Sequence, residues 1–134
     1  MSEEPFRPAA HFRQEQRQLE RCGLDSWQAL AQLADHDLRR LAADGRASEQ
    51  RLRRLRGQAR LIEEVGLTPA QASLLLYAGI PSRAALAEAQ PETLLRQLGR
   101  FQRQLLGREA PPLDLALVLA WIRRARAGPG RSPN

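Results

Sequence analysis

The sequence has one cysteine, Cys22, so no disulfide can form within the chain. A free cysteine usually behaves as a small hydrophobic side chain, and we expect Cys22 to be buried. The longest apolar run, Leu113–Ile122, is interrupted only by Asp114 and is shorter than the roughly 20 residues that span a bilayer. The first residues lack the basic region and apolar stretch of a secretory signal. We therefore expect no contact with a membrane and a cytoplasmic location.

Aromatic and β-branched residues are also scarce, and Leu and Ala supply most of the apolar side chains. Leu and Ala lose little side-chain freedom in a helix, whereas sheets favour β-branched and aromatic residues. A chain of 134 residues normally forms one domain with a modest core. The composition therefore predicts an all-α fold in a single compact domain.

Lysine is absent, because all 21 basic residues are arginine, and the formal net charge is +6. A basic surplus attracts phosphate backbones, and the planar guanidinium group matches the geometry of a phosphate. The nucleotide composition of a genome can produce the same bias toward arginine. The charge of this basic protein thus permits nucleic-acid binding without requiring it.

Residues suited to metal binding or catalysis are few. The only two histidines, His11 and His36, have no neighbours at the spacing of metal ligands. Glu63 and Glu64 have no histidine or serine nearby to complete an acid-base or nucleophilic set. We expect no metal site, no cofactor and no enzymatic activity.

The clearest feature that the sequence does contain is an internal repeat. Residues 22–41 return as residues 78–97 after a shift of 56 positions, which pairs Gly23 with Gly79 and Ser26 with Ser82. A repeat of this kind predicts two related structural units. These are a first unit at 11–64 and a second unit at 65–127, between flexible tails at 1–10 and 128–134.

Helical periodicity, together with capping and stop residues, predicts about eight helices, four in each unit. Those of the first unit are expected at 11–21, 27–33, 35–43 and 49–64, with Ser26, Asp35 and Ser48 as caps. Those of the second unit are expected at 70–78, after Ser82 to 89, from Pro91 to about 106, and at 113–127, with Thr68-Pro69 as the first start signal.

The second unit resembles a helix-hairpin-helix motif in the order of its residues. The residues that carry this likeness are Gly66–Leu75, Ala78-Gly79-Ile80, Ala85-Leu86-Ala87 and Pro91-Glu92-Thr93-Leu94. With Pro111-Pro112 and a last helix ending in Trp121-Ile122-Arg123-Arg124, residues 12–127 resemble a bacterial domain-of-unknown-function family built from tandem helix-hairpin-helix units. Residues 78–98 resemble, more distantly, the DNA-binding C-terminal domain of the bacterial RNA polymerase alpha subunit.

Helix-hairpin-helix units commonly bind DNA without reading its sequence, and the resemblance implies such a site in the hairpin. This site would comprise Gly66, Leu67, Thr68 and Ala70. Glycines let the backbone approach a phosphate, and the next helix offers free N–H groups. Here Thr68 replaces the second glycine and Pro69 removes one N–H donor, so the phosphate site is weakened. The equivalent positions 10–12 contain no glycine, and we expect no phosphate role there.

Two rows of arginines recur at helical spacing. The first row is Arg53, Arg56 and Arg60, and the second row is Arg96, Arg100 and Arg103. Such rows can follow a phosphate backbone. Alternatively, they are solvated helix faces whose charges pair with Glu49, Glu63 and Glu92.

The last predicted helix is apolar nearly all round, so it either lies centrally in the fold or presents a partner surface. That surface would comprise Leu115, Val118, Leu119 and Ile122. Trp27 and Trp121 would stack on bases in a single-strand binder, but their apolar neighbours favour packing in the core. The same holds for Tyr77 and Phe101.

Two functional hypotheses remain. In the first, the protein is not an enzyme and binds the DNA backbone without sequence specificity, through the hairpin and the arginine rows. In the second, it is a protein-interaction or adaptor module that has lost phosphate binding. Steep salt dependence of DNA binding would favour the first hypothesis, because neutralised phosphates release counterions. A stable protein complex that survives nuclease treatment would favour the second.

Overall fold

The computed structural model describes residues 5–105 and 113–128. The first half contains η1 (Ala10–Phe12), α1 (Arg13–Arg21), α2 (Trp27–Ala31), α3 (Asp35–Ala42) and α4 (Glu49–Arg60). The second half contains η2 (Leu61–Val65), α5 (Pro69–Tyr77), α6 (Arg83–Ala87), α7 (Pro91–Leu105) and α8 (Leu115–Arg126).

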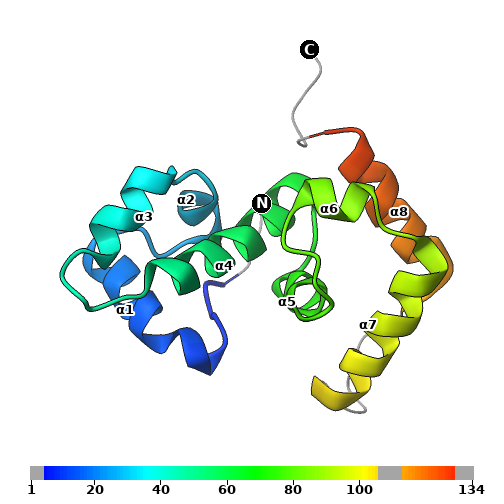
Figure 1. The fold of residues 1–134 in the computed structure, drawn as a ribbon, viewed down its shortest axis with the longest axis horizontal. Coiled ribbons are helices and arrows are strands. Elements are labelled where there is room, and N and C mark those ends of the chain that lie inside the picture. The colour runs from blue at the N-terminus through cyan, green and yellow to red at the C-terminus, as the bar shows by residue number, and fades with distance from the viewer. Residues whose placement is uncertain (1–4, 106–112, 129–134) are drawn as a thin grey trace.

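The described residues form eight α-helices and no strand, which confirms the predicted all-α fold in one compact domain. Figure 1 shows α1–α3 gathered at one end and α5–α8 at the other, with α4 running between them. α4 packs against α2 and α3 on one side and against α5 on the other, and α8 packs against α6 and α7. Residues 1–4, 106–112 and 129–134 lie outside the described residues. They include part of the predicted N-terminal tail, most of the predicted C-terminal tail, and Pro111-Pro112.

The predicted serine and threonine caps are confirmed at four helix starts. Ser26, Ser48, Thr68 and Ser82 each accept a hydrogen bond from the backbone N–H three residues later, at 3.0–3.2 Å. Each bond satisfies one of the N–H groups that a helix leaves unpaired at its first turn. The sequence therefore locates these starts correctly.

Two aspartates differ from their predicted roles. Asp35 is not a cap, because Asp37 instead accepts a 2.8 Å hydrogen bond from the N–H of Ala34 at the start of α3. Asp114 does not lie within the last helix but caps it, accepting a 2.8 Å hydrogen bond from the N–H of Leu117. Capping by Asp114 moves the start of α8 to Leu115 and lets the carboxylate stay exposed.

The core is one cluster of buried side chains that draws on both halves of the chain. Trp27 and Trp121 are both buried, as predicted, but the same prediction is wrong for Tyr77, which is 43% exposed. Residues 5 and 6, assigned to the N-terminal tail by sequence, contact Trp27, whose Nε1 donates a 3.0 Å hydrogen bond to the Pro5 carbonyl. The prediction for Cys22 is wrong: the residue is exposed, because it stands after the last turn of α1, beside Gly23 at φ 70°.

α8 lies partly in the core, so the four residues of its predicted partner surface do not share one exposed face. Val118 and Ile122 are buried at 0% and 2% exposure, so assigning them to a partner surface was wrong. Leu115 and Leu119 point outward, each 36% exposed. The helix thus has a buried face and an apolar outer face, which its nearly uniform sequence does not reveal.

A glycine allows α4 to touch the turn before α6. A Cβ built on Gly57 would lie 2.8 Å from the carbonyl oxygen of Pro81, closer than real Cβ contacts. The predicted helix 49–64 is α-helical only to Arg60, after which the chain continues directly as the π-helical turn η2. Gly57 therefore sets how closely the first half approaches the second.

We predict that Gly57→Ala destabilises the protein by about 1–3 kcal/mol, because the new methyl group forces the α4 backbone away from Pro81. Urea unfolding measures the change. Gly99→Ala in α7 is the matched control, because a Cβ there has no neighbour within 4 Å. That substitution is expected to stabilise by about 0.5–1 kcal/mol through helix propensity. Equal effects of the two substitutions would contradict the close approach at Gly57.

Candidate nucleic-acid interface

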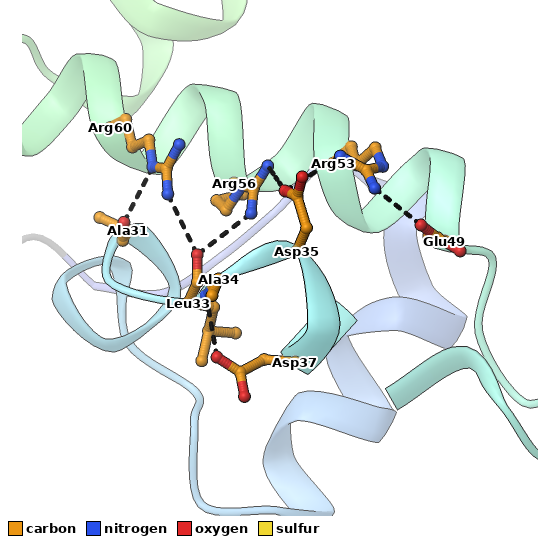
Figure 2. A network of polar contacts seen from close by, with 9 residues as sticks. All are labelled: Ala31, Leu33, Ala34, Asp35, Asp37, Glu49, Arg53, Arg56 and Arg60. Carbon is orange, nitrogen blue, oxygen red and sulfur yellow. Dashed lines mark hydrogen bonds and ion pairs between the residues drawn. The ribbon is translucent and has the colours of Figure 1, made fainter. Parts of the chain in front are cut away.

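The first arginine row lies along α4 and faces α2 and α3 (Figure 2). Arg60 donates from Nε to the Ala31 carbonyl at 2.9 Å and from Nη2 to the Leu33 carbonyl at 3.0 Å. Arg56 donates from Nη1 to the same Leu33 carbonyl at 3.1 Å. Carbonyl groups at a helix end lack intrahelical partners, and a cation there also suits the helix dipole. Arg56 and Arg60 thus close the C-terminal end of α2.

The outer part of this row forms ion pairs around Asp35 (Figure 2). Asp35 Oδ1 lies 2.8 Å from Arg56 Nη2 and 3.1 Å from Arg53 Nη1, and Arg53 Nη2 lies 2.8 Å from Glu49 Oε2. The hydrogen bond from Arg56, followed by that from Arg53, holds the pKa of Asp35 below its ordinary value. The hydrogen bond to Glu49 is the main cause that raises the pKa of Arg53.

These contacts change how the first row must be interpreted. The predicted pairing with Glu49 is present, but Arg56 is only 8% exposed and does not belong to a solvated face. The guanidinium groups of Arg56 and Arg60 are used mainly within the fold. The signal that sequence reasoning lacked is the partner, since Asp35 lies 21 residues before Arg56.

The second row behaves differently. Arg96, Arg100 and Arg103 are all exposed on α7, and none of the ion pairs found among residues 5–105 and 113–128 includes them. Glu92, the partner expected for this row, is also exposed and forms none of these pairs. The α7 row therefore presents three cations to solvent.

The hairpin between η2 and α5 has the expected turn but little free donor capacity. Gly66 adopts φ 80° and Leu67 is buried. The N–H of Thr68 donates to Gln71 Oε1 at 3.0 Å, and the N–H of Gln71 donates to Thr68 Oγ1 at 3.1 Å. This capping box uses two N–H groups that a bound phosphate would otherwise take. Arg124 Nη1 lies 3.4 Å from where a Cβ of Gly66 would stand, so one cation adjoins the turn.

A pocket of about 410 Å³ opens where α4 meets the turn before α6. Its lining residues are Arg53, Arg56, Gly57, Arg60, Glu64, Pro81, Ser82, Arg83 and Ala84. Arg83 is the functional candidate that sequence reasoning missed, because it is an isolated arginine with no periodic partner. It becomes a neighbour of the α4 row only through the packing of the two halves.

Other site types have no support in the described part of the chain. No group of histidine, cysteine, aspartate and glutamate side chains there is arranged to hold a metal ion. None of the helices in that part is both long enough and apolar enough to cross a bilayer.

The comparison with protein families covers nearly the whole fold. The family model described as "Domain of unknown function (DUF4332)" matches residues 9–128. The chain belongs to the DUF4332 family. This membership confirms the resemblance to a domain-of-unknown-function family, and the DUF4332 match includes α4, the pocket and α7. No curated protein and no solved structure matches the chain.

We predict that Asp35→Asn destabilises the protein near neutral pH but not in acid. The folded-state pKa of Asp35 lies below the ordinary value of 3.8, so its contribution is present above that pH and is lost as the pH falls through the folded pKa. Urea unfolding at pH 7 and at pH values below 3.8 measures the gap between variant and wild type. Asp25→Asn, at an exposed loop position, is the control. A gap that persists unchanged in acid would disprove the role of this carboxylate.

Proposed function

We propose that this protein binds nucleic acid through the phosphate backbone, without sequence specificity, and that the exposed arginines of α7 make the principal contacts. The observation that supports this most strongly is the contrast between the two rows: the α4 row is bonded within the fold, and the α7 row faces solvent. Arg96 and Arg103 are separated by about 10 Å along the helix axis. One DNA strand carries a phosphate about every 3.4 Å, so the row is long enough to meet several.

We also propose that the two halves are tandem helix-hairpin-helix units. Gly23 and Gly79, which the 56-residue shift pairs, adopt φ 70° and 85°. In addition, Arg126 Nε donates to the Ala87 carbonyl at 2.8 Å, as Arg60 Nε donates to the Ala31 carbonyl. Ala31 and Ala87 are themselves 56 positions apart. The donors Arg60 and Arg126 are 66 positions apart, but each stands on the last helix of its half, α4 or α8. An arginine of the last helix that bonds the equivalent carbonyl in each half supports one structural unit used twice.

The hairpin has a secondary role in this proposal. Its capping box already uses the N–H groups of Thr68 and Gln71, so a phosphate would have to displace two hydrogen bonds to reach them. The exposed residues Gly66 and Ala70, with the neighbouring Arg124, offer a supplementary contact. We therefore expect substitutions on α7 to weaken binding more than substitutions in the hairpin.

One observation favours the alternative function, a protein-interaction module. Tyr77, Leu115 and Leu119 are the large apolar side chains identified as exposed in the described part of the chain, at 43%, 36% and 36%. Leu115 and Leu119 stand one turn apart on the outer face of α8, a spacing suited to a partner helix. This alternative predicts a complex that withstands nuclease and is lost in Leu115→Ser/Leu119→Ser.

We predict that affinity for a random-sequence DNA duplex falls at least tenfold between about 50 and 200 mM salt, since several phosphates are neutralised on binding. Fluorescence anisotropy with a labelled duplex measures this. Arg96→Ala/Arg100→Ala/Arg103→Ala should weaken binding at low salt and flatten the salt dependence, because each lost phosphate contact reduces the slope by about one.

The matched control is Arg13→Ala/Arg17→Ala/Arg39→Ala. It removes the same three charges from exposed positions on α1 and α3. If net charge alone determined affinity, both triple variants would bind DNA equally weakly, and that result would contradict the assignment of the binding site to α7. Absence of wild-type binding at low salt would reject nucleic-acid binding and direct attention to the outer face of α8.

A further inference from the structure

The pocket between α4 and the turn before α6 contains more cationic than anionic groups. Four arginines and one carboxylate, Glu64, line it. Arg53 is largely neutralised by Asp35 and Glu49, and Arg56 also shares Asp35. Arg60 and Arg83 therefore have Glu64 as their one carboxylate neighbour within the pocket lining. The positive charge that is not balanced locally belongs to these two side chains.

Donor groups of the same two arginines remain free. Arg60 uses Nε and Nη2 on the carbonyls of Ala31 and Leu33, and Figure 2 shows its remaining nitrogen turned away from them. Arg83 uses Nη1 on the Ala125 carbonyl at 2.8 Å. Its Nε is buried and forms an ion pair with Glu64 Oε1 at 3.5 Å, but it has no hydrogen-bond partner within the described structure. A buried donor of this kind costs free energy unless something pairs with it.

The contacts that these arginines do make hold the guanidinium groups in place. The carbonyls of Ala31, Leu33 and Ala125 are backbone atoms of packed helices or their ends, so they anchor both side chains at the pocket wall. Burial lowers the pKa of Arg60, and the neighbouring charge of Arg56 lowers it further, because both disfavour the charged guanidinium group. An anion beside Arg60 would offset its repulsion from Arg56, and neither Arg60 nor Arg83 would first have to be ordered.

We propose that this pocket binds a phosphate group, held between Arg60 and Arg83. Phosphate accepts several charge-assisted hydrogen bonds at once and is commonly bound by paired guanidinium forks. The volume of about 410 Å³ falls within the roughly 300–1,000 Å³ range of small-molecule sites, so the pocket also admits the group that carries the phosphate. The site lies on α4, on Glu64 of η2 and on residues 81–84 at the start of α6, and none of the exposed arginines of α7 lines it.

Inorganic pyrophosphate is the probe for the first experiment, because it presents phosphate charge without a base or sugar. Calorimetric titration of the full chain at constant ionic strength should give saturable binding with one site per chain. Ala84→Glu should weaken it at least about tenfold, since the new carboxylate stands in the pocket lining among the arginines. Ala84 is exposed, so the substitution leaves the core untouched.

Ala116→Glu is the matched control. Ala84 and Ala116 are both exposed and both occupy the second position of a helix, α6 and α8 respectively. The two variants therefore have the same net charge and the same relation to a helix dipole. Pyrophosphate binding should be unchanged in Ala116→Glu. An equal loss in both variants, or no saturable binding to the wild type, would overturn the proposal.

A second arm identifies the source of the phosphate. If Ala84→Glu also weakens binding of the labelled duplex and Ala116→Glu does not, the phosphate belongs to a nucleic-acid backbone. If duplex binding is unchanged while pyrophosphate binding is lost, the ligand is a free phosphate ester. Duplex binding by a wild type that does not bind pyrophosphate would reject this pocket but leave the proposed function of α7 intact.

Discussion

The fold depends on the way α4 closes the end of α2. Guanidinium groups from Arg56 and Arg60 pair with the Leu33 and Ala31 carbonyls, and Asp35 then fixes Arg56 from the other side. α2 is only five residues long, and so short a helix has little stability of its own. The carbonyl groups at its C-terminal end accept hydrogen bonds from side chains of α4, so the position of α2 depends on α4. The position of α4 in turn determines where the second half begins.

Local signals predicted the fold well because they act over three or four residues. Ser26, Ser48 and Ser82 cap helices as their sequence context indicates, since a cap needs only its own turn. Asp35 is not the predicted cap but the first residue of α3, and its carboxylate bonds Arg56, 21 residues away. The candidate site depends on such distant pairs: no spacing in the sequence connects Arg83 with Arg60, which meet only when the halves pack.

The two arginine rows show why charge patterning alone cannot assign a function. Both rows have helical spacing, yet Arg56 is buried and bonds one carbonyl and one carboxylate, while Arg100 is exposed. The difference lies in what packs against each helix: α4 has neighbours on two sides, whereas the arginines of α7 stand on its exposed face. Two arginine rows of the same composition can therefore have different roles: one supports a helix end, and the other faces solvent, where it can meet a ligand. The burial of the arginine side chains distinguishes these two roles.

The length of α7 has an evolutionary consequence if the halves are copies of one unit. α3 ends at Ala42, whose counterpart is Leu98, and α7 continues for a further seven residues to Leu105. Arg100 and Arg103 lie in that added stretch. Arg96 lies before this stretch, as the counterpart of Arg40, so two of the three free cations of α7 stand where the helix extends past the repeated region. If the halves arose by duplication, one copy preserves the scaffold while the other varies, and the extension of α7 is where relatives of this chain are expected to differ most.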